Sequence, residues 1–360
     1  MQLIKDFLDK HNITEKRLAI GVSGGADSLA LALLCKQELP DYHIVALTVD
    51  HGLRPTSGQE ADYVAKIMAE FGIEHHILTW EGDKPQTGIE EQARLARYRL
   101  LSDWCKAHDI HYLAIAHHLF DQAETFLMRL ERGSGLFGLS AMQEISEKNG
   151  IKILRPLLNT HPDTLKDYLK QKNIAWVEDE SNQCTDFLRV KMRKFLPLLA
   201  GQTGITAERL CLAAENLYQT REFIEHTVQK IISDKVHLWG TCGASVDVAE
   251  FMSWHNELKF YILSRLICDI SGNAYMPEAE PLRALINNIE KTDFNGATLG
   301  GIYFCKQDLR LWLVKEYRGI ATDCTEKEWT DFEQKVPEVR GLKIPAKLKQ
   351  ALIYEKKQEK

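Results

Sequence analysis

The chain has 360 residues, 44% hydrophobic and 27% charged, a composition that is normal for a soluble globular protein and sufficient in length for two domains. Its net charge of −6 at pH 7 does not suggest a nucleic-acid binder at first sight. It has no run of eighteen apolar residues, and its first seventeen residues mix both charge signs, so we expect neither a membrane span nor a secretory signal.

The first pair of predicted elements is a strand and a helix with a glycine-rich turn between them. Residues 17–22 are apolar enough for a buried strand, and residues 29–34 continue as a helix. The glycine pair in the turn lets backbone N–H groups approach a phosphate with no Cβ in the way. The helix N-terminus behind it supplies unpaired donors and partial positive charge. The turn therefore predicts a nucleotide site formed by Ser23, Gly24, Gly25, Ala26, Asp27 and Ser28.

Two well-known phosphate loops are excluded at this position. A Walker A loop needs a lysine after the glycines, and a dinucleotide fingerprint needs G-x-G-x-x-G. Residues 23–28 instead resemble the S-G-G-x-D-S loop of the ATP-pyrophosphatase (PP-loop) superfamily. That resemblance implies ATP as the cofactor, cut at its α phosphate to give an adenylated substrate and pyrophosphate. An ordinary tight turn capped by Ser28 is the purely structural alternative.

Strand and helix signals alternate through the rest of the first half. Strand-like apolar runs lie at 43–49, 75–79, 112–116 and 151–157, and helical patterns lie at 57–71, 88–107, 120–132 and 162–172. This alternation predicts an α/β fold with a doubly wound, parallel, five-stranded sheet. Ligands of such sheets bind at the carboxyl ends of the strands. We expect the loop at 23–28, Asp50-His51-Gly52 and His117-His118 to meet there.

A second polar group follows the fourth predicted strand. His117 and His118 come at the strand end, and Asp121 and Glu124 share one face if Asp121 opens the next helix. Carboxylates and an imidazole beside a phosphate loop suit a cationic substrate, or removal of a proton from its amine. The predicted catalytic residues are Asp27, His117, Asp121 and Glu124. A helix N-cap with its capping-box partner would also explain Asp121 and Glu124, and no metal-binding spacing is present, so metal ligands stay unassigned.

The pattern changes after about residue 206. Residues 207–235 form one long helical pattern that links to a second unit. Helical signals recur at 257–269 and 281–289, and strand-like runs follow at 301–304 and 310–314. The predicted organisation is a catalytic domain at 1–205, a linking helix at 206–236, a mainly helical domain at 237–315 and a short basic extension at 316–360.

The end of the extension is basic, with seven Lys or Arg and two Glu in residues 340–360. A basic tail is either an RNA contact or a solvated, frayed end. The sequence alone slightly favours the frayed end.

The segment at 116–142 carries a more specific resemblance. Its sequence, AHHLFDQAETFLMRLERGSGLFGLSAM, is similar to the signature HHxDDQAETxLMRLxRGSGxxGLxxM of the tRNA(Ile)-lysidine synthetase family. Further agreement is found at 49–62, 90–101, 154–158, 176–199 and 297–301. Phe120 departs from the pattern because most members carry the first of two aspartates there, and Val190 replaces a common asparagine.

The resemblance implies an activity. Members of the family replace the C2 oxygen of the wobble cytidine, in isoleucine tRNA with a CAU anticodon, by the ε-amine of free L-lysine. The cytidine oxygen attacks the α phosphate of ATP, pyrophosphate leaves, and lysine then displaces AMP. Mg²⁺ is expected with the phosphates. The residues expected to bind lysine are Asp121 and Glu124, and those expected to contact the tRNA are Arg94, Arg97, Arg189 and Arg193. The resemblance also implies that the domain at 237–315 binds the tRNA.

Other interpretations remain open at this point. Two-thiocytidine synthetases share the phosphate loop but carry CxxC for an iron–sulfur cluster, whereas the eight cysteines here form no such pair. GMP synthetase and NAD synthetase use ammonia and lack the HHxxDQAET run. A non-catalytic tRNA-binding relative is favoured by Phe120 and opposed by Asp121 and Glu124. Free thiols suit a cytoplasmic protein, and a homodimer is left open.

Overall fold

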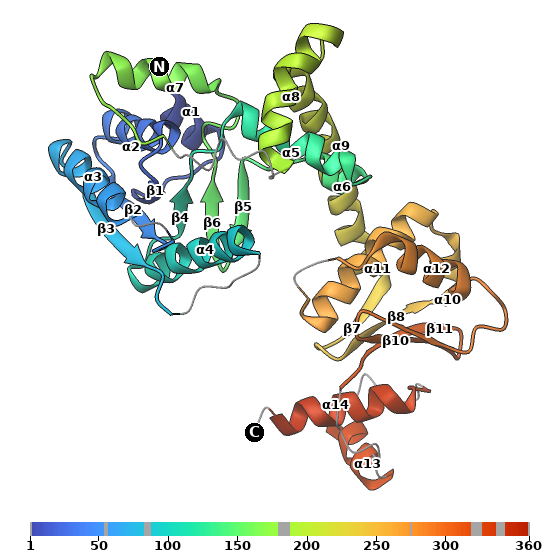
Figure 1. Cartoon of the computed structure of the whole chain (residues 1–360). Helices are drawn as coiled ribbons and strands as arrows, with labels where there is room; N and C mark the ends of the chain where they lie inside the picture. Colours follow the sequence, from blue (N-terminus) through green and yellow to red (C-terminus); the bar gives the residue numbers. More distant parts are fainter. Residues whose placement is uncertain are drawn as a thin grey trace. The chain divides into compact units, whose positions relative to one another are not determined.

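The computed structural model describes residues 2–53, 57–82, 88–178, 188–273, 276–317, 326–335 and 343–358. The chain divides into two compact units, Met1–Arg221 and Glu222–Lys360. The division falls within one long helix, α9 (Ala207–Lys235), which coincides with the predicted linking helix. Each unit contains a sheet of its own (Figure 1).

The first unit is built on a six-stranded sheet in the order β3-β2-β1-β4-β6-β5. Its strands are β1 (Arg17–Gly21), β2 (His43–Asp50), β3 (Glu74–Thr79), β4 (Tyr112–Ala114), β5 (Ile145–Lys148) and β6 (Ile151–Leu154). The strands from β3 to β6 pair in parallel, and β5 pairs antiparallel with β6 at the edge. The predicted α/β class and all five predicted strands are confirmed.

The predicted count of five strands is wrong, because β5 was missed. This strand reads Ile-Ser-Glu-Lys, which is short and half polar. Two residues with positive φ, Asn149 (51°) and Gly150 (72°), join it to β6. An Asn-Gly pair of this kind is a strong hairpin signal, and it was the feature from which the strand could have been found.

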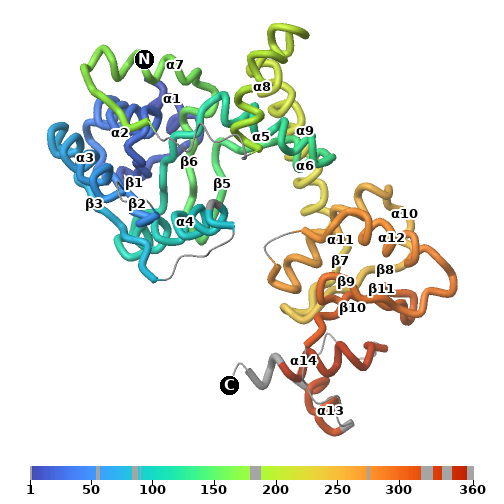
Figure 2. Tube along the Cα trace, viewed as in Figure 1, coloured from blue at the N-terminus to red at the C-terminus, as the bar shows by residue number. Residues whose placement is uncertain are grey.

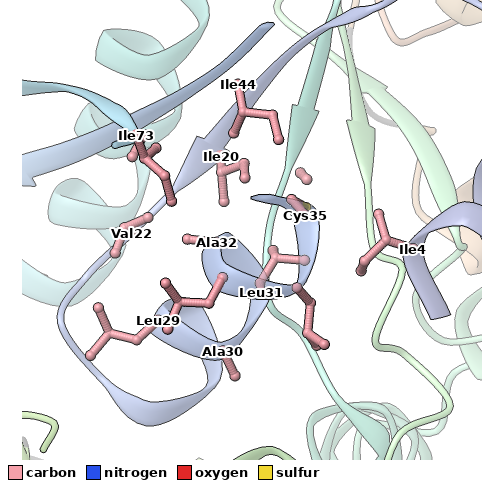
Figure 3. Close-up of a cluster of buried hydrophobic side chains, with 14 of the residues drawn as sticks. Ile4, Ile20, Val22, Leu29, Ala30, Leu31, Ala32, Cys35, Ile44 and Ile73 are labelled. Carbon is pink, nitrogen blue, oxygen red and sulfur yellow. The ribbon is translucent and has the colours of Figure 1, made fainter. Parts of the chain in front are cut away.

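Helices cover both faces of this sheet (Figure 1). One face carries α1 (Leu3–Lys10), α2 (Ala26–Glu38), α3 (Ser57–Glu70) and α7 (Pro162–Gln171), and the other carries α4 (Ile89–Ala107). Alternate residues of β1 serve the two layers, since Ile20 packs with α2 and Ala19 packs on the side of α4. Helix α2 is buried along most of its length, and Figure 3 shows Leu29, Leu31 and other side chains of α2 packed with Ile20. This burial holds the start of α2 rigidly at the end of β1.

Three more helices of the first unit pack against the beginning of α9. They are α5 (Leu119–Glu131), α6 (Leu136–Leu139) and α8 (Leu188–Thr203). Their shared apolar cluster includes Ala123, Leu127, Leu196 and Ala214. Because the apolar faces of α5 and α8 meet in this cluster, polar side chains of the two helices are also brought together beside it.

The second unit contains a five-stranded antiparallel sheet in the order β7-β8-β11-β10-β9. Its elements are β7 (Val236–Trp239), β8 (Gly243–Asp247), α10 (Val248–Ser253), α11 (Asn256–Ser271), α12 (Ala279–Ile289), β9 (Ala297–Leu299), β10 (Ile302–Gln307) and β11 (Arg310–Lys315). Both predicted helices and both predicted strand runs are confirmed. The description of this unit as mainly helical nevertheless omitted three short strands and therefore the sheet itself.

The chain ends in two helices that cover the second face of this sheet, α13 (Glu326–Lys335) and α14 (Ala346–Gln358) (Figure 2). Leu311 and Leu313 of β11 pack with α10–α12, whereas Trp312 between them packs with Trp329 and Leu348. Leu348 is completely buried. The slight preference for a frayed, solvated tail is therefore wrong for the described part of α14. None of the helices in the described ranges is long and apolar enough to cross a membrane.

Candidate active site

The loop at 23–28 connects β1 to α2, as predicted, and its backbone requires glycine. Gly24 has a φ of 86°, which side-chain-bearing residues rarely adopt. A Cβ at Gly24 would lie 3.2 Å from Cγ2 of Val64 and 3.5 Å from Cγ2 of Val177. Gly25 is the N-cap of α2 and leaves the backbone donors of the first helical turn uncovered by a side chain.

Hydrogen bonds within the loop fix its shape. The hydroxyl of Ser28 donates to the carbonyl of Gly25 (3.0 Å) and accepts from the backbone N–H of Ser23 (3.1 Å). The N–H of Val177 donates to the carbonyl of Gly24 (3.0 Å) and ties the loop to the chain beyond α7. The donors at the start of α2 are thus preorganised for an anion such as a phosphate.

Asp27 lies in the first turn of α2. Its Oδ1 is buried and has no hydrogen-bond partner among the described residues. Burial raises the pKa of Asp27, while the nearby His118 acts in the opposite direction. Across the described ranges, no group of three or more His, Cys, Asp or Glu side chains could hold a metal ion on its own. Mg²⁺ that binds together with substrate phosphates often has a single carboxylate ligand from the protein. The carboxylate of Asp27 fits this role.

His118 connects the phosphate loop to α5. Its Nδ1 accepts from the N–H groups of Phe120 (3.2 Å) and Asp121 (3.3 Å), so the ring caps α5 and its proton is on Nε2. This Nε2 lies 3.6 Å from Oδ2 of Asp27 and 3.5 Å from Oδ2 of Asp121. The sequence prediction placed His117, not His118, among the catalytic residues. The signal for His118 was its position three residues before Asp121, as in a capping box.

Asp121 is the third residue of α5 and is held ionised. Its Oδ2 accepts from the N–H of His118 (3.0 Å), which completes the capping box. The alternative in which Asp121 is itself the N-cap, with Glu124 as its partner, is wrong because the helix starts at Leu119. Burial acts to raise the pKa of Asp121, but His118, Arg189 and the hydrogen bond from the His118 N–H lower it overall.

Glu124 is fully buried and bound by two arginines of α8. Arg189 Nε donates to Oε2 (3.0 Å), and Arg193 donates from Nε to Oε1 (2.7 Å) and from Nη2 to Oε2 (3.3 Å). The guanidinium Nη2 atoms of the same arginines lie 3.6 and 3.8 Å from Oδ1 of Asp121. A predicted lysine-binding carboxylate and two predicted tRNA contacts therefore lie together in one ion-paired group, which we call the α5–α8 clamp: Glu124, Arg189 and Arg193.

His117 lies beside this group, and Arg155 contacts it. Nε of Arg155 donates to Nδ1 of His117 (3.2 Å). Burial lowers the pKa of His117 to about 3, and Arg155 adds to this effect. Arg155 was missed as a site residue although it belongs to the quoted segment 154–158, because nothing in that segment indicates which side chain it meets.

The remaining predicted residues lie on the outside of the same unit. Arg94 and Arg97 are exposed on α4, and Nε of Arg97 donates to Nε2 of His51 (3.4 Å). Phe120 packs edge-on against His161, with ring centroids 4.9 Å apart, and contributes to the apolar cluster of α5 and α8. The position where the family signature has a carboxylate is thus used for packing.

Comparison with known proteins shows the family of the chain. The PP-loop domain family matches residues 1–199. The tRNA(Ile)-lysidine synthase of Wolbachia pipientis wMel is 36% identical over 87% of this chain and 74% of its own length. The corresponding enzyme of Ruegeria pomeroyi is 35% identical over 85% of this chain and 73% of its own. Among solved structures, the U34-tRNA thiolase NcsA from Methanococcus maripaludis, with its [4Fe-4S] cluster, is similar in fold, with a TM-score of 0.50 at 19% identity over 60% of this chain and 79% of that one.

These matches include both the phosphate loop and the residues around α5. A phosphate loop alone would fit any enzyme of the superfamily, but the curated relatives align with the second unit as well. The chain therefore belongs to the PP-loop domain family and, within it, to the family of the tRNA(Ile)-lysidine synthases.

Proposed function

We propose that this protein is a ligase that joins free L-lysine to C2 of the wobble cytidine in the CAU-anticodon isoleucine tRNA. ATP would be converted to AMP and pyrophosphate, and the product base would be lysidine. The observation that carries the proposal is the position of His118, which lies close to both the phosphate loop and Asp121. Its Nε2 lies 3.6 Å from Oδ2 of Asp27, in the phosphate loop, and 3.5 Å from Oδ2 of Asp121, in α5. A nucleotide on the loop and an amine beside Asp121 would be within reach of each other.

The phosphate loop suits the first step of this reaction. An amide-like cytidine oxygen is a poor leaving group, and adenylation converts it into a good one. Negative charge that develops on the phosphates would meet the N–H donors at the start of α2. Mg²⁺ would supply further charge neutralisation when bound, and Oδ1 of Asp27 is the oxygen that fits it.

The carboxylate of Asp121 suits the second step. Asp121 is kept ionised by its neighbours, so it can attract the ammonium group of lysine. The amine must lose a proton to attack, and the nitrogen becomes strongly acidic as its bond to C2 forms. Even a carboxylate with a lowered pKa, such as that of Asp121, can then accept the proton.

The proposed tRNA contacts are arginines at the outside of the first unit. Arg94 and Arg97 are exposed on α4 and are available to backbone phosphates. Arg189 and Arg193 are 43% and 38% exposed, so part of each guanidinium reaches solvent even while it holds Glu124. We also propose that the protein acts in the cytoplasm, where the substrate tRNA is found.

The proposal is tested by incubating the full-length protein with ATP, radiolabelled lysine and a transcript of the isoleucine tRNA. We expect label in the RNA and an equal amount of pyrophosphate. A transcript with uridine at the wobble position is the control and should stay unlabelled. ATP-independent RNA binding without incorporation would instead identify a non-catalytic tRNA-binding relative.

The role of the loop is tested by Ser28→Ala. This change removes a hydroxyl with two loop hydrogen bonds, each worth about 1 kcal/mol, so the KM for ATP should rise about 30-fold. Ser102→Ala is a matched control, because the hydroxyl of Ser102 is also buried but has no hydrogen-bond partner among the described residues. Unchanged ATP kinetics in Ser28→Ala would count against the loop as the nucleotide site.

A further inference from the structure

Hydrogen bonds to residues 143–146 hold Arg155 in one orientation. It follows β6 directly and is only 9% exposed. Its Nη1 donates to the carbonyl of Gln143 (2.7 Å) and to the hydroxyl of Ser146 (2.9 Å), and its backbone N–H donates to the carbonyl of Glu144 (2.8 Å). Because a guanidinium is rigid and planar, fixing Nη1 also fixes the direction in which Nε–H points.

That direction is towards Nδ1 of His117, at 3.2 Å. An arginine nitrogen is always a donor, so Nδ1 must be the acceptor in this hydrogen bond. The one proton of the neutral imidazole is then on Nε2. Among the described residues, Nε2 of His117 has no hydrogen-bond partner, so this N–H remains available to a bound molecule.

The charged groups around His117 keep the ring neutral. Asp121 of α5 favours the imidazolium, while Arg155, Arg189 of α8 and Arg94 of α4 oppose it. Together with burial, the three arginines outweigh the single carboxylate and lower the pKa of His117 to about 3. At neutral pH the ring therefore has a donor at Nε2 and an acceptor that is already occupied.

We propose that Arg155 is a positioning residue that holds His117 in the Nε2–H form, so that His117 offers substrate a hydrogen-bond donor and not a proton acceptor. A donor of this kind would face an oxygen of the reacting substrates, where negative charge develops as pyrophosphate leaves in the first step or as AMP leaves in the second. The assignment of that oxygen rests on the proposed function, but the state of the ring does not. Proton transfer from the lysine amine is then left to the carboxylates.

The state of the ring can be measured in the full-length protein by two-bond ¹H–¹⁵N correlation spectra after ¹⁵N-histidine labelling. The signals of His117 are identified among the 13 histidines by comparison with His117→Gln. The wild type should show Nε2 protonated and Nδ1 unprotonated from pH 5 to 8. In Arg155→Met the ring should populate both neutral forms, and its pKa should rise by about one unit or more. Arg155→Lys keeps the charge without the rigid fork and should restore the low pKa but not the single form.

Arg129→Met is the matched control. Arg129 is another partly buried arginine that binds two carbonyls of the same region, those of Gly138 and Ala141. It makes no contact with His117 and should leave the signals of the ring unchanged. A general loss of local order would disturb both variants alike.

Three results would overturn the proposal. They are an Nδ1–H ring in the wild type, an imidazolium in the wild type at pH 7, and an unchanged ring in Arg155→Met. The wild-type spectrum decides the matter even if Arg155→Met does not fold. Absence of lysidine formation together with an Nε2–H ring would overturn the proposed function and leave this inference standing.

Discussion

Replacing Arg193 with methionine is expected to lower the free energy of unfolding of the first unit by about 3 kcal/mol. The change leaves Oε1 of Glu124, a carboxylate with 0% side-chain exposure, without its 2.7 Å partner. The expected value is at the lower end for a broken buried ion pair, because Arg189 still binds the other oxygen. Urea unfolding followed by circular dichroism measures the effect.

Lys194→Met is the control for this experiment. Lys194 is the next residue of α8 and is exposed. Its replacement by methionine also removes one positive charge. It should change stability by no more than about 0.5 kcal/mol. Glu124→Gln should cost less than Arg193→Met, about 2 kcal/mol, because the two partly exposed arginines can turn to water. If Arg193→Met left stability unchanged and only weakened tRNA binding, Arg193 would be an RNA contact and not a structural member of the clamp.

Asp27→Asn is expected to reduce pyrophosphate formation by about 100-fold or more without lowering thermal stability. The buried Oδ1 of Asp27 has no hydrogen-bond partner among the described residues, and burial raises the pKa of the group, so its charge is a cost to the fold. An amide of the same size removes that charge and also removes the proposed ligand for Mg²⁺. Initial rates and melting curves of the same preparations test both parts.

The exposed Asp62 of α3 offers a matched control for this variant. Asp62→Asn makes the same chemical change away from the loop and should leave the rate of pyrophosphate formation unaltered. A variant of Asp27 that melts well below the wild type would show that the carboxylate supports the fold, and full activity in that variant would remove Asp27 from the site.

The sequence predicted the layers of the first unit because their signals are local. Long apolar runs define β1 and β2, and the loop that follows β1 needs a glycine at position 24, where φ is 86°. It did not predict β5 or the short strands of the second sheet, since strands of three to five residues have too few positions to show a period.

The sequence predicted the carboxylates of the candidate site, but it did not predict which side chains they contact. Asp27 and Asp121 lie together because parallel strands end at one edge of the sheet, a rule that can be applied to a sequence. The hydrogen bond from Arg155 to His117 joins residues 38 positions apart, and the clamp on Glu124 joins α5 to a helix more than 60 positions away. Such pairs depend on helix packing and side-chain orientation, which no spacing in the chain encodes.

Helices α13 and α14 have a consequence for how RNA could meet the second unit. Single-stranded RNA is often read on an open sheet, whose outward aromatic rings stack with splayed bases. Here Trp239 and Trp312, on β7 and β11, are enclosed beneath the terminal helices with exposures of 4% and 1%. Both rings pack inside an apolar cluster and are not accessible for stacking with bases. Nucleotides that bind this unit would therefore contact the edges of its strands, the ends of its helices or its loops, and not the face of the sheet that carries these two rings.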